Sequence, residues 1–286
     1  MMKFKRIKCH VSPISSTSSS LKVHFSDYRD MLAKLVQPPK FDNFADERNH
    51  LKKRLSASLR LFGKLGYDEG LAGHISVRDP EYRDTFWVNP LGIDFGMMKV
   101  SDLVRCDQRG TVIEGSRPVN LAAFVIHSRI HQARKDVQAV AHSHSPAGKA
   151  WSVFGRKLEP LSQDSCAFYN DHTVYNNYGG VAFELDEGTR IAQSLEHYKA
   201  VILQNHGILT VGTTIDAAIW WYITFEKCCQ IQLTVESCRR EDLKANLITP
   251  EEAQKAFEIL GNPLLGWLQF QPLYSRIIRE QPELLL

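Results

Sequence analysis

The chain has 286 residues, of which 43% are hydrophobic and 23% are charged, a composition that excludes a protein disordered along its whole length. The 35 basic and 32 acidic residues leave a net charge of +3, which is too even a balance to indicate a nucleic-acid-binding surface. No apolar run approaches the roughly 20 residues of a membrane-spanning helix, so we expect no transmembrane segment and no membrane partner.

The cysteines and the N-terminal segment bear on cellular location. Six cysteines are scattered along the chain without a Cys-x-x-Cys pair, which favours reduced thiols in a cytoplasmic protein. Residues 1–22 are basic, rich in serine and free of acidic residues. This composition predicts a disordered tail over residues 1–40, with an organellar transit peptide, and hence a mitochondrial location, as the alternative.

The first half of the chain predicts a helix followed by short strands. Apolar residues at three- and four-residue spacing predict a helix over 41–65, with Asn43 or Asp46 at its start and Gly66 at its end. Strands follow over 70–78 and 85–89. The turn signal Asp107-Gln-Arg-Gly110 predicts a hairpin between short strands at 103–105 and 111–113.

The second half alternates between helical and strand patterns. The expected helices span 120–134, 146–154, 187–196, 214–238 and 250–260. The expected strands span 137–144, 179–184, 199–204 and 208–211. This order predicts an α/β domain over residues 41–245, with helices on both faces of a sheet. Residues 246–286 are expected to form a helical extension that packs on the domain or on a neighbouring subunit.

Three histidines predict a metal site. Ala141-His-Ser-His-Ser145 falls in an expected strand, where side chains alternate, so His142 and His144 share a face with Cα atoms about 6.5–7 Å apart. His206 follows another expected strand and precedes a glycine, which allows a tight backbone turn. Three imidazoles with one open position are typical of a catalytic first-row metal site.

Four segments in order and at consistent spacing carry a family resemblance. They are Gly73-His-Ile-Ser-Val-Arg78, Asn89-Pro-Leu-Gly92, Ala141-His-Ser-His-Ser145 and Leu203-Gln-Asn-His-Gly-Ile-Leu-Thr-Val-Gly212. Together they resemble the class II aldolase/adducin family. The resemblance implies a three-layer α/β/α fold with a mostly antiparallel sheet, like that of the adducin head. It also implies a homotetramer, and a divalent metal bound by His142, His144 and His206. Zinc is favoured, with manganese, iron or cobalt as alternatives.

The chain departs from the sugar-phosphate aldolases of this family. Those enzymes carry a catalytic glutamate at the position of Ala123, and Asn120 nearby cannot exchange a proton at neutral pH. Their phosphate pocket uses the asparagine of a Gly-Asn pair where this chain has His74. It also uses a hydroxyl side chain just before the glycine that is equivalent to Gly92. We therefore expect His74, Ser76 and Gly92 to line a substrate cleft that does not favour a phosphosugar.

Other polar residues are candidates for proton transfer. His127 and His131 lie four apart on an expected helix and so share one face. In the polar stretch 163–172, Asp164, Tyr169 and His172 are further candidates, because this region borders the active site in the family. The predicted catalytic set is therefore Asn120, His127, Tyr169 and His172.

The sequence favours a metal-dependent lyase that decarboxylates or cleaves a small oxygenated acid or carbonyl compound through a metal-stabilised enolate. A non-haem Fe(II) oxygenase on the same histidines is the second hypothesis. A non-catalytic, adducin-like assembly module is the third. Retention of all three metal histidines favours an enzyme, because adducin heads generally lack them.

Overall fold

A computed structural model describes residues 37–286, except 181–184 and 239–241, so most of the predicted tail lies outside the described residues. The helices are α2 (Phe44–Leu65), α3 (Leu121–Ala133), α4 (Pro146–Ser152), α5 (Leu185–Leu195), α6 (Ile215–Ser237), α7 (Pro250–Leu260) and α8 (Pro263–Glu280). Short 3₁₀ helices are η1 (Phe95–Met97), η2 (Val100–Asp102), η3 (Asp164–Phe168) and η4 (Pro282–Leu285). The strands are β1 (His74–Arg78), β2 (Phe86–Val88), β3 (Val104–Cys106), β4 (Val112–Glu114), β5 (Ala139–Ser143), β6 (His172–Tyr175), β7 (Ala200–Leu203) and β8 (Gly207–Gly212).

The strands form one 8-stranded sheet in the order β4-β3-β2-β1-β5-β8-β7-β6. Neighbouring strands run antiparallel, except that β6 runs parallel to β7. The predicted hairpin forms between β3 and β4, where the Gly110 amide donates to the Asp107 carbonyl at 3.1 Å. The mostly antiparallel sheet predicted from the sequence is confirmed.

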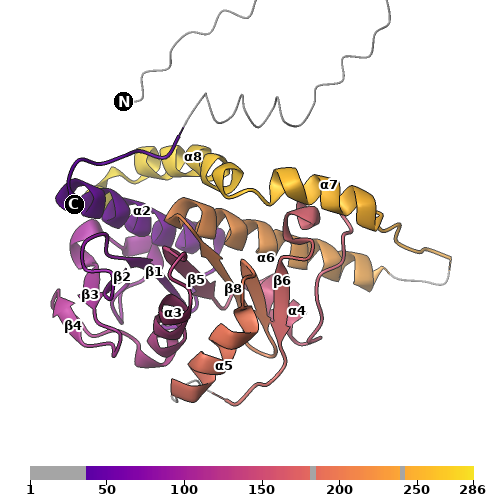
Figure 1. Cartoon of the computed structure of the whole chain (residues 1–286), viewed down its shortest axis with the longest axis horizontal. Helices are drawn as coiled ribbons and strands as arrows, with labels where there is room; N and C mark the ends of the chain where they lie inside the picture. The colour runs from indigo at the N-terminus through magenta and orange to yellow at the C-terminus, as the bar shows by residue number, and fades with distance from the viewer. Residues whose placement is uncertain (1–36, 181–184, 239–241) are drawn as a thin grey trace, which may run out of the picture. The chain divides into compact units, whose positions relative to one another are not determined.

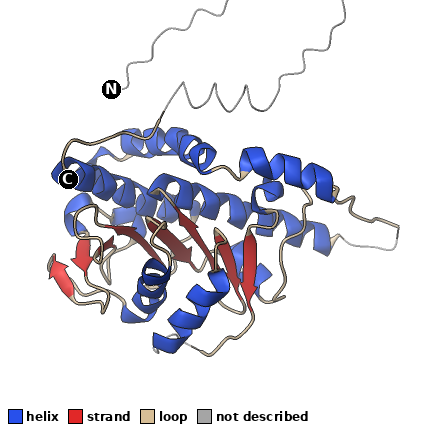
Figure 2. Cartoon of the chain, in the orientation of Figure 1, coloured by secondary structure: helices blue, strands red, loops and turns tan. Residues whose placement is uncertain are grey.

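Helices cover both faces of this sheet, which gives three layers (Figure 1). On one face, α2, α4 and α6 pack on alternate strand residues such as Ile75, Ala141 and Ile202. On the other face, α3 and α5 pack on the intervening residues, including Val140 and Val201. Figure 2 shows the strands enclosed between these helices. The predicted α/β/α architecture is confirmed, and it follows from the two-residue period of strands.

The helix ends follow the expected capping chemistry. The Asn43 side chain accepts a hydrogen bond from the Asp46 amide at 2.9 Å, and α2 ends at Gly66 in the left-handed region (φ 70). At the start of α6, the Thr214 hydroxyl accepts from the Ala217 amide at 3.1 Å. Of the two residues proposed to begin the first helix, Asn43 therefore acts as the cap.

Two local predictions differ from the structure. His172, interpreted as the end of a polar stretch, begins strand β6, because parallel pairing with β7 supplies hydrogen bonds that no local pattern reveals. The strand expected at 179–184 lies largely outside the described residues, and Gly179 and Gly180 are not in a strand.

The C-terminal region packs closely on the rest of the domain. Helix α8 lies along α6 and α2, and Gly266 fits against the Trp221 ring, where a Cβ atom would come within 2.6 Å. The described residues cluster as one compact unit, and the proposed division at residue 245 stays a prediction. None of the helices in the described ranges has the length and apolar character needed to span a bilayer.

Candidate metal centre

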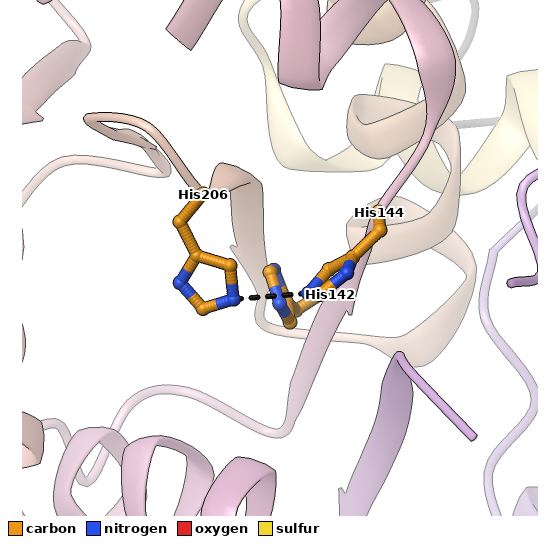
Figure 3. Close-up of side chains that lie close together, drawn as sticks. All are labelled: His142, His144 and His206. Atoms are coloured by element: carbon orange, nitrogen blue, oxygen red, sulfur yellow. Dashed lines mark hydrogen bonds between the residues drawn. The ribbon is translucent and has the colours of Figure 1, made fainter. Parts of the chain in front are cut away.

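Three histidines converge at one end of the central strands. His142 lies in β5, His144 follows this strand directly, and His206 lies in the tight turn between β7 and β8. One ring nitrogen from each lies within 4.8 Å of the others, and Figure 3 shows the three rings turned toward one another. Antiparallel pairing of β5 with β8 produces this arrangement, since it sets His142 opposite Leu209 and brings the β7–β8 turn to the end of β5.

The distance between two of the three rings is compatible with a shared tetrahedral cation. The Nε2 atoms of His144 and His206 are 3.0 Å apart, close to the ~3.3 Å edge expected for two imidazoles on a zinc ion with bonds of about 2.0–2.1 Å. The Nδ1 atom of His142 lies 2.8 Å from the Ile208 carbonyl and donates to it, which leaves Nε2 free to bind. His142 is buried while the other two rings are half-buried, so a fourth position would open toward solvent.

Burial keeps these imidazoles neutral, as metal binding requires. It lowers the pKa of His206 to about 4 and holds the pKa of His142 well below its usual range, with smaller effects from the neighbouring rings. Burial also lowers the pKa of His144. The three side chains are therefore in the ligand form at neutral pH.

Close backbone contacts surround the histidines. Gly73 has φ 93, and a Cβ atom there would lie 3.1 Å from Cβ and 3.2 Å from Cα of Ser143, the residue between His142 and His144. Gly207 has φ 155 and lies against the carbonyl of the same serine, where a Cβ atom would approach within 3.2 Å. Glycine at these positions lets three chain segments meet beside the rings.

Gly73→Ala should lower both stability and metal affinity. The left-handed backbone costs alanine about 1 kcal/mol or more, and the added methyl also presses on Ser143. Gly70→Ala is the matched control, because Gly70 also has a positive φ (57) but open space around it. Urea unfolding and zinc titration of both variants would separate the effect of the contact with Ser143 from the cost of the positive φ. Equal losses in the two would contradict the proposed role of Gly73.

Helix α6 holds the loop that carries His144. The Tyr222 hydroxyl donates to the Ser143 carbonyl at 2.9 Å and lies 2.8 Å from the Ser145 hydroxyl. The buried Glu226 carboxylate accepts from the Ser145 hydroxyl at 2.5 Å and from the Gly148 amide at 2.6 Å. Sequence reasoning did not single out Tyr222 or Glu226 as site residues. A carboxylate in an otherwise apolar helical run is a signal that could have identified Glu226.

The predicted cleft residues His74 and Ser76 lie on the same sheet face as His142. In the β1–β5 register, His74 is paired with His142 and Ser76 with Val140. The Ser76 hydroxyl contacts His127 Nδ1 at 2.8 Å and His131 Nε2 at 2.9 Å. The structure therefore brings these two α3 histidines to the sheet face that carries His142.

Of four further residues, Glu69 lies beside one of the three histidines. The Asn120 amide donates to the Leu71 carbonyl at 3.3 Å, and Ala123 lies in the first turn of α3. Gly92, a predicted cleft residue, has φ 83 with no heavy atom near its Cβ position. Glu69 was not singled out from the sequence, yet its carboxylate lies 3.8 Å from His144 Nδ1 and accepts from Lys149 at 2.6 Å.

The structure places the remaining predicted residues away from the histidine cluster. Asp164 begins η3 and Tyr169 follows its last residue. The η3 segment packs beside α7. His172 begins β6 and is paired with Ala200, at the opposite end of β7 from His206. His172 Nδ1 donates to the Phe168 carbonyl at 2.7 Å, and Nε2 accepts from the Leu158 amide at 3.0 Å. Both ring nitrogens thus bind backbone, and we leave these three residues out of the proposed site.

Burial of His172 predicts a stability loss in acid. Burial lowers the pKa of this ring to about 4, against about 6.5 in an unfolded chain. Unfolding therefore takes up a proton, and stability that is present above pH 6.5 is lost as the pH falls toward 4. His172→Gln should reduce the proton uptake on unfolding by about one, measured from the pH dependence of urea unfolding. An unchanged slope would contradict the assignment.

Known proteins resemble the chain over most of its length. The family model "Class II Aldolase and Adducin N-terminal domain" matches residues 53–233. "Decarboxylase NovR" from Streptomyces niveus is 46% identical over 250 residues, which cover 87% of this chain and 91% of the relative. "4-hydroxy-3-prenylphenylpyruvate oxygenase/4-hydroxy-3-prenylbenzoate synthase" from Streptomyces roseochromogenus subsp. oscitans is 46% identical over 249 residues, covering 86% and 88%.

A solved structure agrees with these sequence matches. "L-fuculose 1-phosphate aldolase" from Glaciozyma antarctica PI12 superposes with a TM-score of 0.82 and 45% identity, over 88% of this chain and 98% of that one. The family resemblance of the four sequence segments is thus supported by the family model, by relatives along most of the chain and by the fold. The chain belongs to the class II aldolase and adducin family.

Proposed function

We propose that this protein is a metal-dependent lyase that uses His142, His144 and His206 to bind a divalent cation, with zinc favoured. The observation that carries the proposal is the convergence of three ring nitrogens within 4.8 Å, with the ring of His142 oriented by the Ile208 carbonyl. When bound, a divalent cation supplies Lewis-acid stabilisation of negative charge on substrate oxygen.

We propose a small oxygenated acid, such as a 2-oxo or 2-hydroxy acid, as the substrate class, and decarboxylation as the favoured reaction. Loss of carbon dioxide needs no base to begin, which suits a site with Ala123 where the sugar-phosphate aldolases have glutamate. A relative named as a decarboxylase at 46% identity supports this choice. The relative named as a fuculose-phosphate aldolase, at 45%, keeps retro-aldol cleavage as the alternative.

The chain's own residues would position the substrate on the sheet face beside the histidines. His74 lies opposite His142 in the β1–β5 pairing, Ser76 lies two residues further along β1, and His127 contacts Ser76 from α3. Gly92 and Asn120 would line the outer part of the cleft. The family resemblance further supports a homo-oligomer, expected as a tetramer, which light scattering of the purified protein would test.

An oxygenase is the second candidate, because one relative's name combines an oxygenase with a benzoate synthase activity. The two candidates differ in their need for dioxygen. Metal content would be measured by elemental analysis, followed by a screen of 2-oxo and 2-hydroxy acids for carbon dioxide or aldehyde release under air and under nitrogen. A lyase keeps its activity under nitrogen, whereas an oxygenase loses it. Substoichiometric metal and no turnover would instead support the assembly-module hypothesis.

A further inference from the structure

A row of buried polar groups lies on the sheet face that carries His142. It comprises Arg78 and Ser76 of β1 and His131 and His127 of α3, and His74 lies beside it. His127 Nε2 and His74 Nδ1 are buried without a hydrogen-bond partner among the described residues. The two rings meet edge to face with centroids 5.9 Å apart. A buried polar atom without a partner is costly, so each such case calls for an explanation.

The row begins at a group that can only donate. The Arg78 guanidinium has no acceptor atom, and burial lowers its pKa only to about 10, so it stays charged at neutral pH. Its Nη2 atom donates to the His131 carbonyl at 2.7 Å and lies 3.3 Å from His131 Nδ1. Because two donors cannot share that contact, His131 Nδ1 accepts, and a neutral His131 carries its proton on Nε2.

The proton positions then follow along the row. His131 Nε2 donates to the Ser76 oxygen at 2.9 Å, and the single hydroxyl proton of Ser76 goes to His127 Nδ1 at 2.8 Å. A neutral His127 therefore carries its proton on Nε2, which is the buried atom without a partner. The row ends in an N–H group that needs an acceptor.

Burial supports the neutral form of both rings. It holds the pKa of His127 well below its usual range and does the same for His131, where the Arg78 charge adds to the effect. The Val137 carbonyl acts in the opposite direction on His131. If that carbonyl held the proton on His131 Nδ1, every donor and acceptor along the row would change places, and His127 would carry its proton on Nδ1. The tautomer of His127 is therefore the quantity to measure.

The position of His127 indicates which group accepts the hydrogen bond from its Nε2–H. His74, its neighbour at 5.9 Å, is the cross-strand partner of His142. We propose that His127 donates its Nε2–H to a substrate oxygen held beside the metal histidines, and that Arg78, His131 and Ser76 are positioning residues that set this tautomer. The proposal rests on the proposed function, and it specifies the substrate as an acid or carbonyl compound whose oxygen gains negative charge in the reaction. A fixed donor at such an oxygen stabilises the transition state without transferring a proton.

The first test measures the tautomer itself. Solid-state NMR of the full-length protein labelled with ¹³C,¹⁵N-histidine reports which nitrogen of each ring is protonated, and His127→Gln assigns the His127 signals. We expect the Nε2–H form of His127 in the native protein and a new Nδ1–H population in Ser76→Ala. Ser128→Ala is the matched control, because this buried α3 serine bonds to the Val125 carbonyl outside the row. An Nδ1–H form in the native protein would overturn the proposal.

The second test measures binding of oxalate to the zinc-loaded protein by calorimetry. His127→Phe should weaken oxalate binding about tenfold or more, because a hydrogen bond to a charged group is lost. Ser76→Ala should weaken it in the native background, but by less than about twofold in a His127→Gln background, where the amide donates regardless of Ser76. Equal oxalate affinity in the native protein and His127→Phe would refute the donor role. Zinc content, recorded on the same samples, separates this failure from failure of the proposed metal site.

Discussion

His142→Ala should abolish stoichiometric metal binding and, with it, any lyase activity. Removal of this imidazole leaves two half-buried ligands, and loss even of an outer-shell partner typically costs about 10–100-fold in metal affinity. We therefore expect zinc affinity to fall by more than about 100-fold. Elemental analysis of the purified variant and competition with a chromogenic chelator would measure the change.

The matched control for this variant is His197→Ala. The side chain of His197 is 74% exposed, and it lies outside the histidine cluster. The His197→Ala protein should retain the native metal content. Circular dichroism would check that both variants are folded. A His142→Ala protein that still carries one equivalent of metal would refute the metal centre.

Asp216→Ala should reduce the free energy of unfolding by about 3–5 kcal/mol, because it leaves a buried cation without its counter-charge. Arg54 Nη1 lies 3.0 Å from Asp216 Oδ1 in a buried ion pair. Gln271 joins the two, accepting from Arg54 at 3.1 Å and donating to Asp216 at 2.9 Å. The cluster connects α2, α6 and α8, so the C-terminal helices should loosen first. Urea unfolding would measure the loss.

Two controls separate charge from general damage. Asp216→Asn keeps the size and the acceptor for Gln271 but removes the charge, so it should retain part of the stability. Glu251→Ala removes an ion pair with Lys255 that is exposed on α7, and it should leave the unfolding midpoint unchanged. If Asp216→Ala proves as stable as Glu251→Ala, the buried pair does not hold the helices together.

The convergence of the three histidines could be predicted because their signal is local. A strand's two-residue period fixes the relation of His142 to His144, and a glycine after His206 marks a turn. The contribution of Tyr222 and Glu226 could not be predicted in this way. Their partners, Ser143 and Ser145, lie about 80 positions away along the chain, and only the packing of α6 brings them together.

Long-range packing also explains why the strand that begins at His172 was not predicted. The pattern around His172 is that of a polar loop, and its two backbone hydrogen bonds arise from the fold of residues 158–168 around it. The helical extension expected after residue 246 does form, and α8 continues through Pro272 although proline removes a helical donor. The buried Trp267, Phe270 and Ile277 hold it in place, and such tertiary support is invisible in local propensity.

The pairing of β5 with β8 has a consequence for preparing the protein. His142 already bonds to Ile208 across these strands, so the ligand geometry is established by the sheet and not by the ion. Small zinc domains, in contrast, unfold when a chelator removes their metal. This protein should keep its secondary structure after chelation, and reconstitution with zinc, manganese or iron, one at a time, would then assign the native cofactor.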